Sequence, residues 1–140
     1  MSKYKLVIIP LLGVIISQVI KFVIESIKYK KILVNRLLNG SGGLPSSHAT
    51  LVSSLTSLIY LDYGYSEYFA ISLIFSLVIL YDAVGVRYEV GKHARVLNEL
   101  NNFSKPLKEL IGHTLFEVLC GIILGIIISI IFNSFLWLIF

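Results

Sequence analysis

Three ionisable side chains lie near the ends of apolar segments and could together perform acid–base or nucleophilic chemistry: His48, His113 and Glu117. His113 and Glu117 are four residues apart at the start of an apolar run, so on a helix they share one face. A carboxylate placed there can accept the imidazole N–H, fix the tautomer and raise the basicity of the ring, as in hydrolytic triads. For an isolated His/Glu pair, a helix-end hydrogen bond is the structural alternative.

A second feature is the sequence Gly-Gly-Leu-Pro-Ser-Ser-His at residues 42–48, directly before another apolar run. Glycines allow close backbone approach, and N–H groups with a serine hydroxyl at a helix N-terminus form an anion site. This stretch therefore predicts a seat for a phosphoryl group beside His48. The residues expected to form that seat are Gly42, Gly43, Ser46 and Ser47.

The chain that contains these residues is strongly apolar. Of its 140 residues, 56% are hydrophobic and only 14% are charged, and the mean hydropathy is +0.87. Soluble domains have about 25% charged residues. The composition predicts one all-α integral membrane domain over residues 1–140, a small helical bundle whose partner is the lipid bilayer and not nucleic acid.

Four segments are long and apolar enough to span a bilayer: 6–27, 45–61, 68–86 and 115–135. Pro45 is expected at the N-terminus of the second helix, where its missing N–H costs nothing. The serines and threonines of that span suggest packing against other helices instead of lipid. Segment 87–108 has apolar residues at helical spacing before Pro106, and it is expected to be an amphipathic segment on the membrane surface over the site.

Four crossings would bring residues 35–48 and 82–113 to one face of the membrane. Together with Lys28, Lys30 and Lys31, which lie between the first span and residue 35, nine of the 12 Lys and Arg residues fall on that face. By the positive-inside rule this face is cytoplasmic, which predicts a multi-pass cell-membrane protein with its site facing the cytoplasm. Attraction to anionic headgroups, at about 1 kcal/mol per charge, explains the same residues without any site.

The fourth span contains Gly121 and Gly125, a spacing that allows another helix to approach closely. A homodimer contact through these glycines and packing within one chain are both open.

Three blocks of the sequence resemble the type 2 phosphatidic acid phosphatase superfamily, which includes the vanadium haloperoxidases. Residues 43–48, Gly-Leu-Pro-Ser-Ser-His, are similar to its Pro-Ser-Gly-His signature, and residues 112–121 are similar to its third motif. With Tyr-Asp-Ala-x-Gly-Val-Arg at residues 81–87, Gly91 and residues 97–98, the chain looks most like the divergent branch of small bacterial and plastid membrane proteins.

The resemblance implies a phosphatase that needs no metal or other cofactor and acts on a lipid phosphate or pyrophosphate monoester. His113 would be the nucleophile that forms a phosphohistidine, Glu117 would orient it, and His48 would be the general acid. Neutral imidazole is nucleophilic near pH 7, and imidazolium donates a proton at the same pH.

Two cationic motifs of that superfamily are missing. No Lys precedes an Arg-Pro pair at the expected spacing, and the arginine expected six residues before His113 is Leu107. Phosphoryl transfer needs cations on the equatorial oxygens. The expected substitutes are Arg87 first, followed by Lys92, Lys108, Arg36 and Lys21.

Two other interpretations remain. A non-catalytic membrane protein could retain the pocket to bind lipid headgroups or a protein partner. Residue types alone also permit a metal site made by His48, Asp82, His113 and Glu117. For Asp82, an ion pair with Arg87 about one helical turn away is the structural alternative.

Overall fold

The computed structural model describes residues 4–30, 42–100 and 105–139 and is all-helical over these ranges. The helices are α1 (Lys5–Tyr29), α3 (Ser47–Tyr63), α4 (Glu67–Val84), α5 (Val86–Leu100) and α6 (Leu115–Ile139). The expected small helical membrane bundle is confirmed. Within the described residues, three helical stretches have the length and hydropathy to cross a membrane: Lys5–Tyr29, Glu67–Leu100 and Leu115–Phe135. Helix α3, with 17 residues, is at the lower limit for a span.

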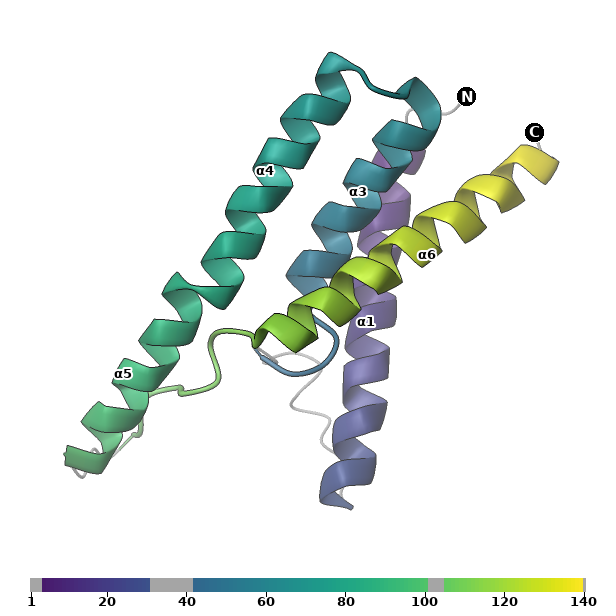
Figure 1. Cartoon of the computed structure of the whole chain (residues 1–140). Coiled ribbons are helices and arrows are strands. Elements are labelled where there is room, and N and C mark those ends of the chain that lie inside the picture. Colours follow the sequence, from purple (N-terminus) through teal and green to yellow (C-terminus); the bar gives the residue numbers. More distant parts are fainter. Residues whose placement is uncertain (1–3, 31–41, 101–104, 140) are drawn as a thin grey trace.

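Helix α3 occupies the centre of the bundle, packed against α1, α4 and α6 (Figure 1). Its small and hydroxyl-bearing residues make this possible: Thr50 and Ser54 have no exposed surface, and Leu58 is equally buried. The hydroxyls of Thr50 and Ser53 donate to the backbone of the same helix, at Ser46 O and Ala49 O, so both are satisfied inside the bundle. The sequence predicted that this segment, with its serines and threonines, packs against other helices, and this prediction is confirmed.

Large apolar side chains instead face outward on α1, α4 and α6. Ile15, Ile71 and Phe75, for example, are 59%, 69% and 57% exposed. Such a surface is stable in lipid and not in water. The chain is therefore apolar outside and partly polar inside, as expected for a membrane bundle.

The glycines of α6 pack against α3 of the same chain. A Cβ on Gly121 would lie 2.5 Å from Ser46 O, and one on Gly125 would lie 2.6 Å from Thr50 O. Only glycine permits this approach. The glycine face of α6 is therefore covered by α3 of the same chain, which is one of the two alternatives that the sequence left open.

Both termini and the α3–α4 turn lie at one end of the bundle, as Figure 1 shows. A buried ion pair ties this end together: Lys5 Nζ lies 2.5 Å from Asp62 Oδ1 and donates to Asn133 Oδ1 at 2.8 Å. The opposite end carries the start of α3, α5 and the segment that leads into α6. All the predicted site residues that the structure describes lie toward that end.

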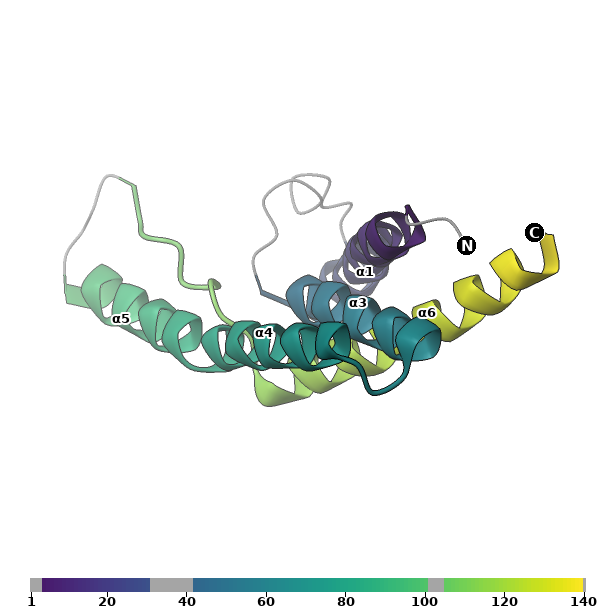
Figure 2. The same ribbon diagram turned by 90° about the horizontal axis from the view of Figure 1, so that it is seen from above.

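Two sequence expectations need correction here. Pro45 precedes the helix instead of starting it, because Ser46 is the N-cap and α3 begins at Ser47. The amphipathic segment forms α5, which ends at Leu100, before Pro106. After a break at Gly85 it continues the line of α4 (Figures 1 and 2) and does not fold across the site.

Candidate functional site

The segment before α3 has a backbone that favours glycine. Gly42 and Gly43 have φ values of +83° and +87°, which side-chain-bearing residues rarely adopt. Space is also short, because a Cβ on Gly43 would lie 2.8 Å from Glu25 Oε1 and 3.4 Å from Lys21 Cδ. The glycines thus let this turn lie directly against polar side chains of α1.

Backbone hydrogen bonds join this turn to the rest of the site. Ser46 N donates to Glu117 O at 3.0 Å, which links the start of α3 to the first turn of α6. His113 N donates to Ala83 O at 3.1 Å, which links the residue before α6 to the end of α4. Three segments distant in sequence are therefore held together by main-chain contacts.

This framework brings the two predicted histidines together. The rings of His48, in the first turn of α3, and His113 are 6.3 Å apart between centroids, with planes inclined at 74°. Hydrogen bonds of about 3 Å from each ring could therefore reach different oxygens of one phosphoryl group. His48 is exposed, whereas His113 is only 4% exposed.

His113 has the electrostatics of a neutral imidazole. Burial, and then the nearby charges of Lys21, His48 and Arg87, lower the pKa of His113 to about 4. Among the described residues neither of its ring nitrogens has a hydrogen-bond partner. At neutral pH the ring therefore carries a lone pair that is not used in any such contact.

Lys21 was the last of the cations that the sequence suggested, yet the structure buries it beside the turn that precedes α3. Its side chain is 2% exposed, although it projects from the middle of an apolar helix. It lies beside Gly43, and its charge acts on both His48 and His113. A sequence signal existed, since Gly13, Ser17, Lys21 and Glu25 recur every four residues on one buried face of α1.

Arg87 lies at the edge of the same group. It forms the expected ion pair with Asp82, with Nε 2.5 Å from Oδ2, and both side chains are partly exposed. Its charge also acts on both histidines. Asp82 thus holds Arg87 beside the pocket while leaving part of the guanidinium for another anion.

The remaining predicted cations lie elsewhere. Lys92 pairs with Glu89 at 2.7 Å and lies over the Tyr88 ring at 4.7 Å, and no contact with either histidine is found in the described part of the chain. Lys108 is exposed. Arg36 lies outside the described residues.

The two serine hydroxyls are engaged within the fold. Ser46 Oγ accepts a hydrogen bond from Ala49 N at 3.4 Å and caps α3, and Ser47 Oγ accepts from Ser17 Oγ at 2.8 Å. Both serines are buried. Each hydroxyl is the acceptor in these bonds, so its own O–H could still donate to an anion without breaking them.

Glu117 does not contact the His113 ring as the spacing suggested. Its Oε2 accepts from Thr114 N at 2.9 Å, and its own N–H donates to Thr114 Oγ1 at 3.3 Å. This reciprocal pair is a capping box, which satisfies two free donors at the start of α6. The i, i+4 argument failed because His113 precedes the helix, so the two side chains do not share a helical face.

The four-residue metal site considered from composition is not formed. Asp82 is paired with Arg87 and the Glu117 carboxylate faces Thr114 N. No group of three or more His, Cys, Asp or Glu side chains is placed to hold a metal ion anywhere in residues 4–30, 42–100 and 105–139.

An apolar groove of about 570 Å³ opens between α4 and α6 near the histidines. Ala49, Ala83 and Val118 form a buried cluster at its base, and Leu80, Val84 and Ile122 pack on it. Ala49 follows His48, and the carbonyl of Ala83 holds the N–H of His113. The groove therefore adjoins the polar pocket. Its lining residues are Leu77, Val78, Leu80, Tyr81, Val84, Leu115, Val118, Leu119 and Ile122.

Comparisons with known proteins identify a family and a relative of this chain. A family model described as "Divergent PAP2 family" matches residues 2–128. A relative from Bacillus subtilis (strain 168), described as "Uncharacterized membrane protein YuiD", is 36% identical over 145 residues, covering 89% of this chain and 91% of that protein. No solved structure matches the chain significantly.

Proposed function

The chain belongs to the divergent PAP2 family, and on that premise we propose that it is a membrane phosphatase that hydrolyses a lipid phosphate or pyrophosphate monoester through a phosphohistidine. The observation that carries the proposal is the convergence of His48, His113 and the buried Lys21 around one turn of backbone with two positive-φ glycines. A helix end, two imidazoles and a desolvated ammonium suit a phosphate dianion.

The proposed reaction has two steps. A ring nitrogen of neutral His113 attacks phosphorus while the bond to the leaving oxygen breaks, and His48 donates its proton to that oxygen. Water then attacks the phosphohistidine and gives a proton to His48, the phosphorus–nitrogen bond breaks, and its electron pair returns to His113. The bound dianion favours the protonated form of His48 that the first step requires.

Lys21 and Arg87 replace the missing cationic motifs in this proposal. Lys21, inside the bundle, would neutralise the equatorial oxygens, and Arg87, partly exposed beside Asp82, would hold the phosphate from the open side. A cation acts most strongly on a transition state where water is excluded, which favours Lys21 as the larger contributor.

The adjoining groove supports a lipid as the substrate. Of its nine lining residues only Tyr81 carries a polar side-chain atom. A volume of about 570 Å³ is within the range of roughly 300 to 1,000 Å³ usual for ligand sites. An apolar groove next to a cationic pocket complements a molecule with a hydrocarbon chain and a phosphate.

A phosphate-release assay tests the proposal. Purified wild type and His113→Asn would be assayed on phosphatidate, a polyprenyl phosphate and a polyprenyl pyrophosphate, with and without EDTA. We expect release by the wild type that EDTA does not affect and that His113→Asn lacks. Vanadate binding without hydrolysis of any substrate would favour a non-catalytic headgroup- or partner-binding protein instead.

We place the pocket at the cytoplasmic face on the strength of the positive-inside rule. In intact cells, a cysteine introduced in the 62–67 turn should react with an impermeant reagent, and one at Lys105 should not. The reverse pattern would place the pocket outside.

A further inference from the structure

We propose that Asn98 is a positioning residue for His113: it clamps the irregular segment 105–112 to α5 and thereby fixes where that histidine lies relative to His48. The kinetic part of the test rests on the proposed function, whereas the spectroscopic part does not.

The need for a clamp follows from how His113 is held. No ring nitrogen of His113 is anchored by a described residue, so its orientation depends on its backbone and on packing. The residues before it, 105–112, form neither helix nor strand. Backbone N–H and C=O groups in such a segment need other partners, because no regular structure supplies them.

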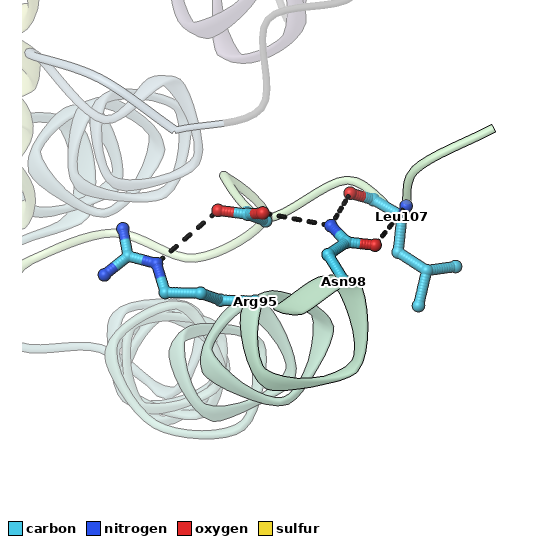
Figure 3. A network of polar contacts seen from close by, with 4 residues as sticks. Arg95, Asn98 and Leu107 are labelled. Atoms are coloured by element: carbon cyan, nitrogen blue, oxygen red, sulfur yellow. Dashed lines mark hydrogen bonds and ion pairs between the residues drawn. The ribbon is translucent and has the colours of Figure 1, made fainter. Parts of the chain in front are cut away.

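Asn98 supplies these partners from the last turn of α5 (Figure 3). Its Oδ1 accepts from Leu107 N at 2.8 Å, and its Nδ2 donates to Leu107 O at 2.9 Å. The side chain thus pairs with both backbone groups of one residue, as a neighbouring strand would. Nδ2 also donates to Glu109 Oε1 at 2.9 Å, and Arg95 Nε donates to Glu109 Oε2 at 3.5 Å.

Close backbone contacts continue from this clamp to the histidine. A Cβ on Gly91 would collide with Glu109 O, and a Cβ on Gly112 would collide with the backbone of Tyr88. The segment therefore lies directly on α5 at two further points. Its end is fixed where His113 N donates to Ala83 O on α4.

Helices α4 and α5 follow one another with only a short break, so both ends of the segment are tied to one nearly continuous support (Figures 1 and 2). Releasing the Asn98 end leaves the contacts of Glu109 with Gly91 and Arg95, the contact at Gly112 and the His113 N–H as attachments of the segment. A displacement of about 1 Å at a reacting group can cost about 100-fold in rate.

The test compares Asn98→Ala with Glu99→Ala, an adjacent exposed residue on α5. We expect Asn98→Ala to lower kcat by about 10- to 100-fold with little change in KM, and Glu99→Ala to leave both unchanged. The His113 imidazole, followed by NMR in detergent, should titrate at a higher pH in Asn98→Ala, because the ring moves away from its buried place beside Lys21, His48 and Arg87. Wild-type turnover and an unchanged titration would overturn the proposal.

Introducing a charge at Asn98 distinguishes a loss of His113 positioning from a general loss of structure. Asn98→Asp should be at least as damaging as Asn98→Ala, because a carboxylate would face the Leu107 carbonyl and the Glu109 carboxylate. Adding Glu109→Gln removes the repulsion between the two carboxylates and supplies a donor to the new one, so the double variant should regain part of the turnover and a lower titration midpoint, although the Leu107 carbonyl still lacks its donor. Equal impairment of the single and double variants would contradict the clamp. If the wild type releases no phosphate, the titration midpoints alone decide.

Discussion

The rings of His48 and His113 lie 6.3 Å apart across the start of two helices, α3 and α6, that are separated by more than fifty residues of chain. No contact between residues that are neighbours in the sequence brings the two rings together. They meet because Gly121 allows α6 to touch the backbone of Ser46 and because the main chain of His113 is anchored on Ala83. The pair is therefore a product of the whole bundle.

Replacing Lys21 by Met should weaken vanadate binding and lower kcat/KM by about 100- to 1,000-fold, a loss comparable to that of one oxyanion-hole donor. Methionine keeps most of the volume in this 2% exposed position but removes the charge. Lys28→Met, an exposed lysine at the end of α1, is the matched control and should change neither quantity. Equal effects of the two substitutions would mean that Lys21 acts only by contributing to the overall positive charge of the protein.

Glu117→Gln should retain most of the activity. Glutamine also forms a capping box, so α6 keeps its start. Glu117→Ala should lower the free energy of unfolding by about 0.5 to 2 kcal/mol, the usual cost of losing a cap. An orienting carboxylate would behave differently, because its amide variant loses about 10,000-fold in kcat. Assays of Glu117→Gln thus decide between a cap and an orienter.

The sequence predicted the helices well because membrane spans depend on local composition. The apolar runs gave α1, α4 and α6, and the serines of α3 marked it as the helix packed by others. The charge and motif arguments also identified His48 and His113 as candidates.

The roles of individual polar residues were harder to predict, because they depend on where each helix begins and on which face it buries. Glu117 caps α6 because the helix starts at Leu115, two residues later than the pairing with His113 required. The spacing of Lys21 with Gly13, Ser17 and Glu25 indicates one buried face of α1, but it does not show which residues of other helices lie beside that face. The contact of Gly43 with α1 joins residues from two different elements. Spacing along the chain does not reveal such a contact.

Filling the groove should affect lipid substrates alone. Leu119 lines the groove and is 48% exposed, whereas Ile127 on the same helix does not line it and is 46% exposed. Leu119→Trp should lower kcat/KM for a lipid phosphate by at least about tenfold and leave nitrophenyl phosphate hydrolysis unchanged, because only the lipid has a chain to place. Ile127→Trp should change neither. A uniform loss on both substrates would count against the groove as a chain site.

The His113 ring should titrate at about pH 4 in an NMR titration, with His113→Asn used for assignment. Because this pKa is lowered from 6.5 by burial first, the folded protein holds the ring neutral where an unfolded chain would protonate it. Below pH 6.5 the unfolded state therefore binds more protons, so stability should fall as the pH drops toward 4. A midpoint near 6.5 would mean that the ring is solvated.

Trapping the intermediate tests the central claim most directly. Wild type, His48→Ala and His113→Asn would be mixed with radiolabelled nitrophenyl phosphate, quenched in alkali to preserve phosphohistidine, and digested for mass spectrometry. Nitrophenolate leaves without a proton, so His48→Ala should still be phosphorylated but should release the phosphate slowly, since His48 is no longer there to take the proton from water. The account predicts label on His113 that accumulates in His48→Ala and is absent from His113→Asn. Phosphate release by His113→Asn at the wild-type rate, or turnover without label on His113, would contradict it.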